Sequence, residues 1–463
     1  MHSLHGVESF IRVDPESAVT RALVSNKHLR AAELEIKRAR VQLHWEGRLN
    51  NPELEISSSS DALGNGEGES VFEVAFAQQF PLTSKLRKAR NLRQVRLGLA
   101  EAEVNDQRRD LANKVRTACI MIATAQQKKE LYTKQSKLNE EIADFLDSAA
   151  ERGEASVLDS TKARLAAKIF KQKTNAASSE IERWLGELRD LLSLSSESGL
   201  IVSADLQLPA ESPSRKIDIK SALSRRPDYQ VALIKTNLAR AELSLAKANS
   251  LEDFAVKIFA ERERKIDAPE GLGSNSMIGL SLSFPLPLRK RNESAIESAN
   301  INISKHHIEA DSLALNIENN IKVALNARQA SLEAARESSS VILEIAEKNL
   351  KGYREAYSAG QVSFVQLQLA QEQKLDLEQS SLELVHEYHI ADASVKYITA
   401  TDIFSGISER RNTFKLKKNE LRDDAFNVNK VEDKVFCLKP SSNIYELLDG
   451  NWLDKINSEE AGY

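Results

Sequence analysis

The sequence is poor in features that mark several other classes of protein. Aromatic residues make up only 5% of the 463 residues, so thin seams between helices are expected more than a thick globular core. No run of 18 apolar residues occurs, which argues against a hydrophobic membrane-spanning helix. The net charge of −4 leaves no basic excess, so nucleic acid is not expected as a partner.

Cysteine and histidine are too sparse to indicate a disulfide framework or a metal site. The two cysteines, Cys119 and Cys437, match no ligand spacing and are predicted to be unrelated thiols. The adjacent His306 and His307 would point apart on a helix. No phosphate loop, nucleophile elbow or Cys/His cluster is found. The sequence therefore predicts a protein that is not an enzyme and has no cofactor and no bound metal.

Proline is absent between Pro81 and Pro209 and between Pro287 and Pro440. Because proline is nearly forbidden in helix interiors, both stretches can hold long helices. A helix from Thr83 to about Ala150 would be roughly 100 Å long. Its apolar residues step by four and three, as in coiled coils. They are Leu111, Val115, Ala118, Ile122 and Ala125, followed by Leu138, Ile142, Phe145 and Ala149. The helix alone favours an ordinary coiled coil, although wide polar faces also suit a hollow tube.

Four segments alternate apolar and polar side chains, as strands with two different faces do. Two of them, SVFEVAFAQQFPL and SMIGLSLSFPLPL, end in Phe-Pro-Leu and lead into the long helices. The apolar face of the later three segments is formed by Phe72, Val74, Phe76, Phe254, Val256, Ile258, Ile278, Leu280 and Leu282. Polar residues predicted on the opposite face are Glu73, Gln79, Lys257, Glu261, Ser281 and Ser283. A slip of one residue would exchange the two faces.

The order of segments occurs twice along the chain. Each copy reads helix, strand, Gly/Ser/Asn-rich loop, strand, long helix, glycine break and returning helix. The predicted divisions are a first repeat (10–200), an inter-repeat linker (201–224), a second repeat (225–400) and a polar C-terminal extension (401–463). Each repeat supplies two strands. Four strands cannot close a barrel, whereas three chains would supply twelve, within the range of membrane barrels.

Several of these segments resemble the TolC family of bacterial outer-membrane efflux proteins. NPELEIS and FPLTSKLRKAR are similar to its CzcC-like branch, which is associated with metal-ion efflux. RRPDYQVA resembles the Arg-Pro-Asp helix start of the family, and AGQVSFVQLQLAQ resembles its second hairpin turn. The resemblance covers about residues 10–400 and includes the order of segments and the duplication.

The resemblance implies a mainly α fold with a small β part. Long antiparallel helical hairpins would form a periplasmic tunnel, and four strands per chain would complete a twelve-stranded barrel in a homotrimer. The function implied is a passive exit duct in the outer membrane, in contact with its lipid. Solutes, with metal ions as one class, would arrive from an inner-membrane pump and a periplasmic adaptor. The apolar strand faces would then meet lipid, and the polar faces would line the lumen.

The two glycine breaks would lie at the periplasmic aperture, where the family meets its adaptor. The contact residues implied are Gly153, Ala155, Ser156, Val157, Leu158, Gly360, Val362, Ser363 and Phe364. Export needs a signal, and MHSLHGVESF shows none, which we interpret as a truncated or misassigned start. A non-membrane coiled-coil scaffold and an adaptor protein are the alternatives. A scaffold leaves the alternating strands unexplained, and adaptors usually have one hairpin instead of two.

Overall fold

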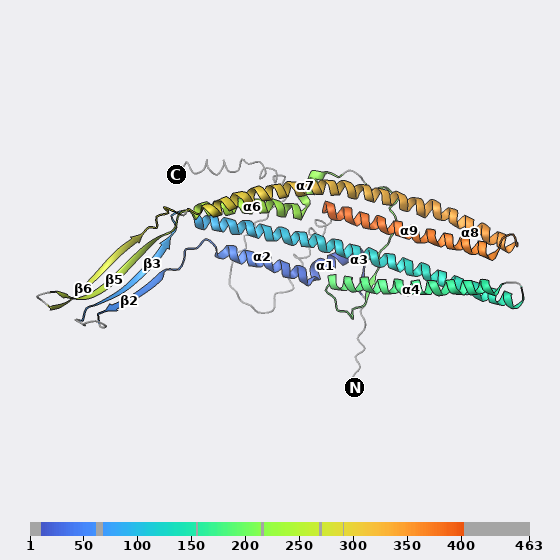
Figure 1. The fold of residues 1–463 in the computed structure, drawn as a ribbon, viewed down its shortest axis with the longest axis horizontal. Coiled ribbons are helices and arrows are strands. Elements are labelled where there is room, and N and C mark those ends of the chain that lie inside the picture. The colour runs from blue at the N-terminus through green and yellow to red at the C-terminus, as the bar shows by residue number, and fades with distance from the viewer. Residues whose placement is uncertain are drawn as a thin grey trace, which may run out of the picture. The chain divides into compact units, whose positions relative to one another are not determined.

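The structure is a computed structural model, and it describes residues 11–61, 68–153, 156–213, 217–267, 271–289 and 291–401. Ala155 and nearly all of the predicted C-terminal extension lie outside these ranges. Most of the described residues are helical, and one four-stranded sheet lies at one end of the long helices (Figure 1). Each helical hairpin has one turn between its two arms, and both turns lie at the opposite end of these helices.

The first repeat contains one very long helix that is preceded by one short strand and two longer strands. Its elements are β1 (Ile11–Val13), α1 (Pro15–Ser25), α2 (Lys27–Trp45), β2 (Glu53–Ser60), β3 (Ser70–Phe80), α3 (Lys85–Glu151) and α4 (Val157–Leu191). The long helix predicted from the absence of proline is thus confirmed as α3. Helices α3 and α4 form the first hairpin.

The rest of the chain follows the same order, with one interruption. At the two ends of the predicted linker, β4 (Leu200–Val202) and α5 (Ile219–Arg225) take the places of β1 and α1. The elements that follow are α6 (Pro227–Ala248), β5 (Phe254–Asp267), β6 (Gly271–Ser283), α7 (Glu293–Arg336), η1 (Glu337–Ile342), α8 (Leu343–Ser358) and α9 (Phe364–Thr399). The segment η1 is a π-helical turn, which the sequence did not predict. Helices α7 and α8 pack against α9 as the second hairpin.

The four predicted strands form one antiparallel sheet in the order β2-β3-β5-β6. The central pair joins the two repeats, because β3 of the first pairs with β5 of the second along their length. The sequence predicted only these four strands. The described residues also contain a small parallel sheet, in which β1 pairs with β4 from Ile11 opposite Leu200 to Val13 opposite Val202. This small sheet ties the start of one repeat to the start of the next.

The largest hydrophobic core lies around the middle of α3. Leu111, Val115, Ala118 and Ile122 are buried there against α1, α4 and the small β1-β4 sheet, as their spacing predicts. Nearer the turn the prediction holds for Ala149 and fails for Phe145, which is 62% exposed, while Leu138 and Ile142 are only partly buried. The buried stripe there is Ser136, Ala143, Leu146 and Ala149. Two apolar stripes run side by side on this part of α3, and the sequence could not show which one α4 covers.

Candidate functional site

The register of the four-stranded sheet decides which side chains share a face. Glu73 lies opposite Glu261, and Lys257 lies opposite Ser281. Since directly opposed residues point to the same side, the six polar residues predicted to share a face do so. The nine predicted apolar residues lie together on the other face. The alternation read from each strand is therefore consistent across the whole sheet.

The polar face carries an ion-pair cluster. The Nζ atom of Lys257 lies 2.8 Å from a carboxylate oxygen of Glu55 and 2.6 Å from one of Glu73. Both glutamates come from the first repeat, and the lysine comes from the second. A groove of about 290 Å³ runs along this face and is also lined by Gln79 and Ser281. The polar face of the sheet therefore carries charged side chains and contains a groove.

The apolar face is uncovered in the single chain. Ile278 is 83% exposed and Leu280 is 64% exposed. Within the described residues, β2 pairs only with β3, and β6 pairs only with β5. Each outer strand therefore keeps one edge of unpaired backbone groups. Open edges and a large apolar surface are unfavourable in water, so both features favour contact with further strands and with an apolar environment.

A close contact fixes the register of the last two strands. Phe259 lies opposite Gly279 on the polar face, and its ring covers the glycine. A Cβ atom added to Gly279 would lie 2.3 Å from the Phe259 ring. This pair was not predicted from the sequence. An aromatic residue on a polar strand face becomes a signal only when the register places a glycine opposite it.

The two predicted glycine breaks are tight turns between helices. Gly153 has φ of +78° and Gly360 has φ of +71°, a left-handed conformation that favours glycine. A serine is the N-cap residue directly before each returning helix. The Oγ atom of Ser156 accepts a hydrogen bond from the backbone N–H of Leu158 (3.2 Å). Ser363 forms a capping box, in which its backbone N–H donates to the Gln366 side chain (2.9 Å).

The two turns differ in what they expose. Val157 and Leu158 of the first turn are 68% and 72% exposed. In the second turn Val362 is half-buried, and Phe364 is only 9% exposed. The Phe364 ring packs into a cluster in which Leu146 of α3 is also buried. The side chain of Phe364 thus joins the tip of the second hairpin to the tip of the first.

An apolar groove of about 310 Å³ lies beside this contact. Phe145 and Ile142 line it from the first hairpin. Tyr357 and Arg354 line it from the second hairpin. The stripe that sequence spacing assigned to a helix seam therefore forms one wall of this groove between the two hairpins.

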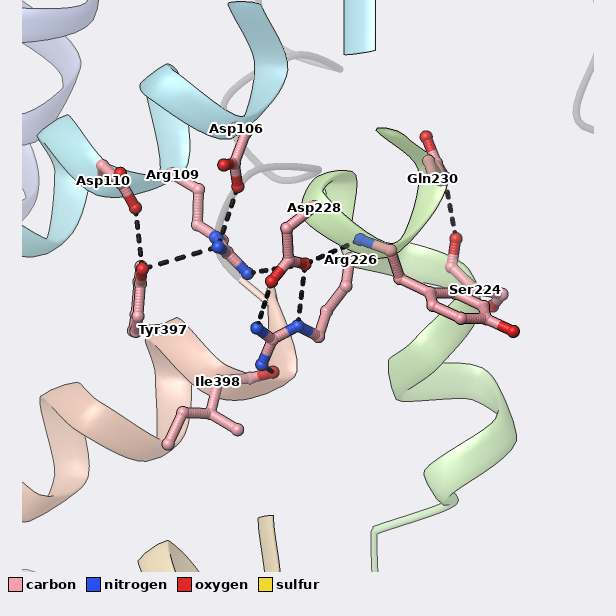
Figure 2. A network of polar contacts seen from close by, with 10 residues as sticks. Asp106, Arg109, Asp110, Ser224, Arg226, Asp228, Gln230, Tyr397 and Ile398 are labelled. Carbon is pink, nitrogen blue, oxygen red and sulfur yellow. Dashed lines mark hydrogen bonds and ion pairs between the residues drawn. The ribbon is translucent and has the colours of Figure 1, made fainter. Parts of the chain in front are cut away.

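A network of buried charges joins α3, α6 and the end of α9 (Figure 2). The Arg109 guanidinium on α3 donates to an Asp228 oxygen (3.2 Å) and pairs with Asp106 (2.8 Å). Arg226 donates to Asp228 (2.9 Å) and to the backbone carbonyl of Ile398 (3.0 Å). Arg109 and Arg226 are 4% and 6% exposed. The Arg-Pro-Asp segment thus connects α3, the start of α6 and the end of α9.

The network shifts the ionisation of its members. Burial opposes the charge on Asp228, yet hydrogen bonds from Arg226 and the nearby Arg109 hold its pKa below the ordinary value. Burial raises the pKa of Asp106. Burial and a hydrogen bond donated to Asp110 (2.7 Å) raise the pKa of Tyr397 to about 12. These shifts fit an ionised structural joint with Asp228 as its central carboxylate.

The remaining side chains offer little for chemistry. No group of three or more His, Cys, Asp or Glu residues in the described ranges is arranged to hold a metal ion. His306 bonds to Glu309 through its Nδ1 atom (2.8 Å), and His307 lies 3.7 Å from Asp311. Cys119 is buried and unpaired, and burial raises its pKa to about 12. None of the helices in the described part of the chain is long and apolar enough to cross a bilayer.

Comparisons with known proteins agree with this architecture. The solved structure of CusC has a TM-score of 0.70 at 17% identity, covering 84% of this chain and 92% of that chain. The CmeC outer membrane channel of Campylobacter jejuni gives 0.68 at 16% identity, covering 85% and 88%. VceC, an outer membrane protein of Vibrio cholerae, gives 0.66 at 16% identity, covering 83% and 95%.

At these identities the solved structures establish the fold: a TolC-like protomer of tandem repeats with long helical hairpins and a small sheet. No protein of curated function matches the chain. The model of the family described as outer membrane efflux protein matches residues 18–193 and 219–401, well over half of the sequence. The chain belongs to the outer membrane efflux protein family.

Proposed function

We propose that three copies of this chain form a passive duct across the outer membrane. The observation that carries the proposal is the exposed apolar face of a sheet with two open edges. Edge β2 of one copy would pair with edge β6 of the next, so three copies would close a ring of twelve strands. The apolar face would then meet lipid, and the polar face would line the lumen.

Strand lengths support this assignment. A tilted strand needs about 9–11 residues to cross a bilayer. Strands β3, β5 and β6, with 11, 14 and 13 residues, are long enough, and the edge strand β2 has 8. The lipid-facing set would be the nine apolar residues, and the lumen set would be the six polar residues. A coiled-coil scaffold outside membranes does not account for the exposed apolar face.

The helices would continue the duct into the periplasm, with the two turns at its far end. We assign the predicted turn residues as the region that meets a periplasmic adaptor, which would connect the duct to an inner-membrane pump. Val157 and Leu158 offer exposed apolar surface for that contact. Phe364 would support the contact region from beneath, since it is buried between the hairpins.

The duct itself requires no catalysis. Solute would move down its gradient through water after an energised partner delivers it at the aperture. Metal ions are proposed as cargo only on the resemblance of NPELEIS and FPLTSKLRKAR to the CzcC-like branch. The metal tolerance of cells that lack the gene, with and without this chain restored, would test that part separately.

Single-channel conductance in a planar bilayer tests the duct. The Phe364→Ala variant removes the ring that joins the two hairpin tips, so its conductance should exceed that of the unmodified chain. Leu165→Ala removes an apolar side chain that is 61% exposed on α4, away from that contact, and it should leave conductance unchanged. Absence of conductance in all three proteins, with the sheet folded, would refute the proposal.

A further inference from the structure

Four parts of the chain mark the junction between strands and helices. Together we call them the junction collar, defined as residues 45–50, 81–90, 249–253, 284–289 and 291–292. The strand-side ends of α2, α3, α6 and α7 meet the sheet here (Figure 1). Hydrogen bonds tie the collar to the end of α6, since the Thr83 hydroxyl donates to the Ala248 carbonyl (2.8 Å) and the Asn292 side-chain amide donates to the Ala246 carbonyl (2.9 Å).

The collar is strongly basic, in contrast to the whole chain. From residue 81 to residue 90 the sequence has four Lys or Arg residues and no Asp or Glu. Two of the few carboxylates nearby are already paired: Asp253 with Lys85, and Glu46 with Arg93 at 2.6 Å. Arg87, Lys88, Arg90 and Arg289 form no ion pair with any carboxylate in the described ranges, and all but the half-buried Lys88 are exposed. The positive charge of the collar is therefore available to a partner.

Exposed apolar side chains stand among these charges. Leu286 and Leu288 are 75% and 79% exposed, directly before Arg289. Trp45 is 59% exposed, and the Arg48 guanidinium lies 4.0 Å from its ring centre. On the sheet side the rings of Phe80, Phe254 and Phe284 stack in a row, with centroids 5.6 Å and 5.3 Å apart. The apolar face of the sheet thus continues to the level of the basic residues.

We propose that the junction collar binds the anionic headgroups of phospholipids in the leaflet on the helical side of the membrane. The inference rests on the proposed function, because it needs the strands to lie in the bilayer. A phospholipid carries both acyl chains that suit the exposed Leu286 and Leu288 and a phosphate that suits the guanidinium groups. Arginine suits phosphate oxygens, aromatic rings suit the membrane boundary, and basic side chains beside a membrane favour anionic lipid.

Native mass spectrometry can test the collar with the full chain. The protein is reconstituted in equal mixtures of phosphatidylglycerol and phosphatidylcholine with identical acyl chains, and the lipids that remain bound are counted. The unmodified chain should retain phosphatidylglycerol preferentially. In the triple variant Arg87→Gln, Lys88→Gln, Arg289→Gln, the ratio of bound phosphatidylglycerol to bound phosphatidylcholine should fall about five-fold for each removed charge that contacts lipid.

A matched control removes the same number of charges elsewhere. Lys134→Gln, Lys137→Gln, Lys348→Gln changes three well-exposed lysines on the hairpins, and its lipid preference should equal that of the unmodified chain. Equal retention of both lipids by the unmodified chain, or an unchanged preference in the collar variant, would overturn the inference. Failure of the unmodified chain to conduct in any lipid would contradict the duct itself, so the two failures are distinct.

Discussion

At the scale of single residues, buried charged side chains connect helices from the two repeats. Arg109 belongs to a run of charged residues on α3, and charged helix positions usually face solvent. Nothing in the local sequence therefore indicated that Arg109 lies inside the protein. Only the fold shows that Asp228 of the second repeat lies against it. The Arg-Pro-Asp segment was predicted only from a family resemblance, and these contacts show that it connects helices.

Replacement of Asp228 should be costly. Asp228→Ala leaves Arg109 and Arg226 buried without their shared carboxylate, and it should lower the free energy of unfolding by about 3 kcal/mol. Denaturation followed by circular dichroism measures the change. Asp144→Ala is the control, because the Asp144 carboxylate is 72% exposed beside Arg164 and its loss should cost less than about 0.5 kcal/mol. Equal effects of the two changes would contradict a structural role for the network.

Two histidines on α9 should make stability depend on pH. Burial lowers the pKa of His386, with Lys128 adding repulsion, and burial lowers that of His389. The unfolded chain then binds protons that the folded chain does not, so stability is full above the ordinary value of 6.5 and falls as pH drops below it. Nearby Asp205, Glu180, Glu387 and Asp392 oppose the shifts, and Lys396 reinforces the shift of His389.

The measurement is the thermal midpoint between about pH 7.5 and about pH 5. The unmodified chain should lose stability in the lower part of this range. His386→Asn should lose less, because it removes one of the two protonation sites. His307→Asn is the control, since His307 is 71% exposed, and it should follow the unmodified chain. The same slope in all three proteins would show that His386 does not titrate as proposed.

At the scale of elements, the sequence predicted what depends on a clear period or a strong local rule. The absence of proline located α3, and alternation located the four long strands and their faces. Strands β1 and β4 were missed because three residues carry no period. The π-helical turn was missed because its residues also suit an α-helix. The seam of α3 near the turn was misassigned because two apolar stripes competed, and only α4 decides between them.

The turn glycines should be sensitive to substitution. Gly153→Ala and Gly360→Ala place a side chain at positive φ and should each cost about 1 kcal/mol. Gly98 lies inside α3, and a methyl group at this position would meet no neighbouring atom, so Gly98→Ala should stabilise by about 0.5–1 kcal/mol. Thermal unfolding of the three variants measures these changes in stability. A stabilising effect at Gly360 would mean that the turn does not have this conformation.

The contact of Phe259 with Gly279 should be equally specific. Gly279→Ala forces the Phe259 ring away and should weaken assembly of the sheet, measured as the fraction of protein that resists dissociation in detergent. The double variant with Phe259→Ala should recover part of that loss, because the ring no longer obstructs the new methyl group. No recovery would indicate that Gly279 is needed for another reason.

At the scale of the whole molecule, one chain leaves its sheet unfinished. The four strands present an apolar face and two open edges, and the described part of the chain offers nothing to cover them. The family assignment and the strand lengths agree with closure by neighbouring copies.

The most direct test is the mass of the folded particle in detergent, determined by native mass spectrometry or light scattering with the detergent contribution removed. Three copies per particle are predicted, because three sheets of four strands complete one barrel. A folded monomer or dimer that keeps its strands would contradict the closure of β2 against β6, and with it the proposed duct.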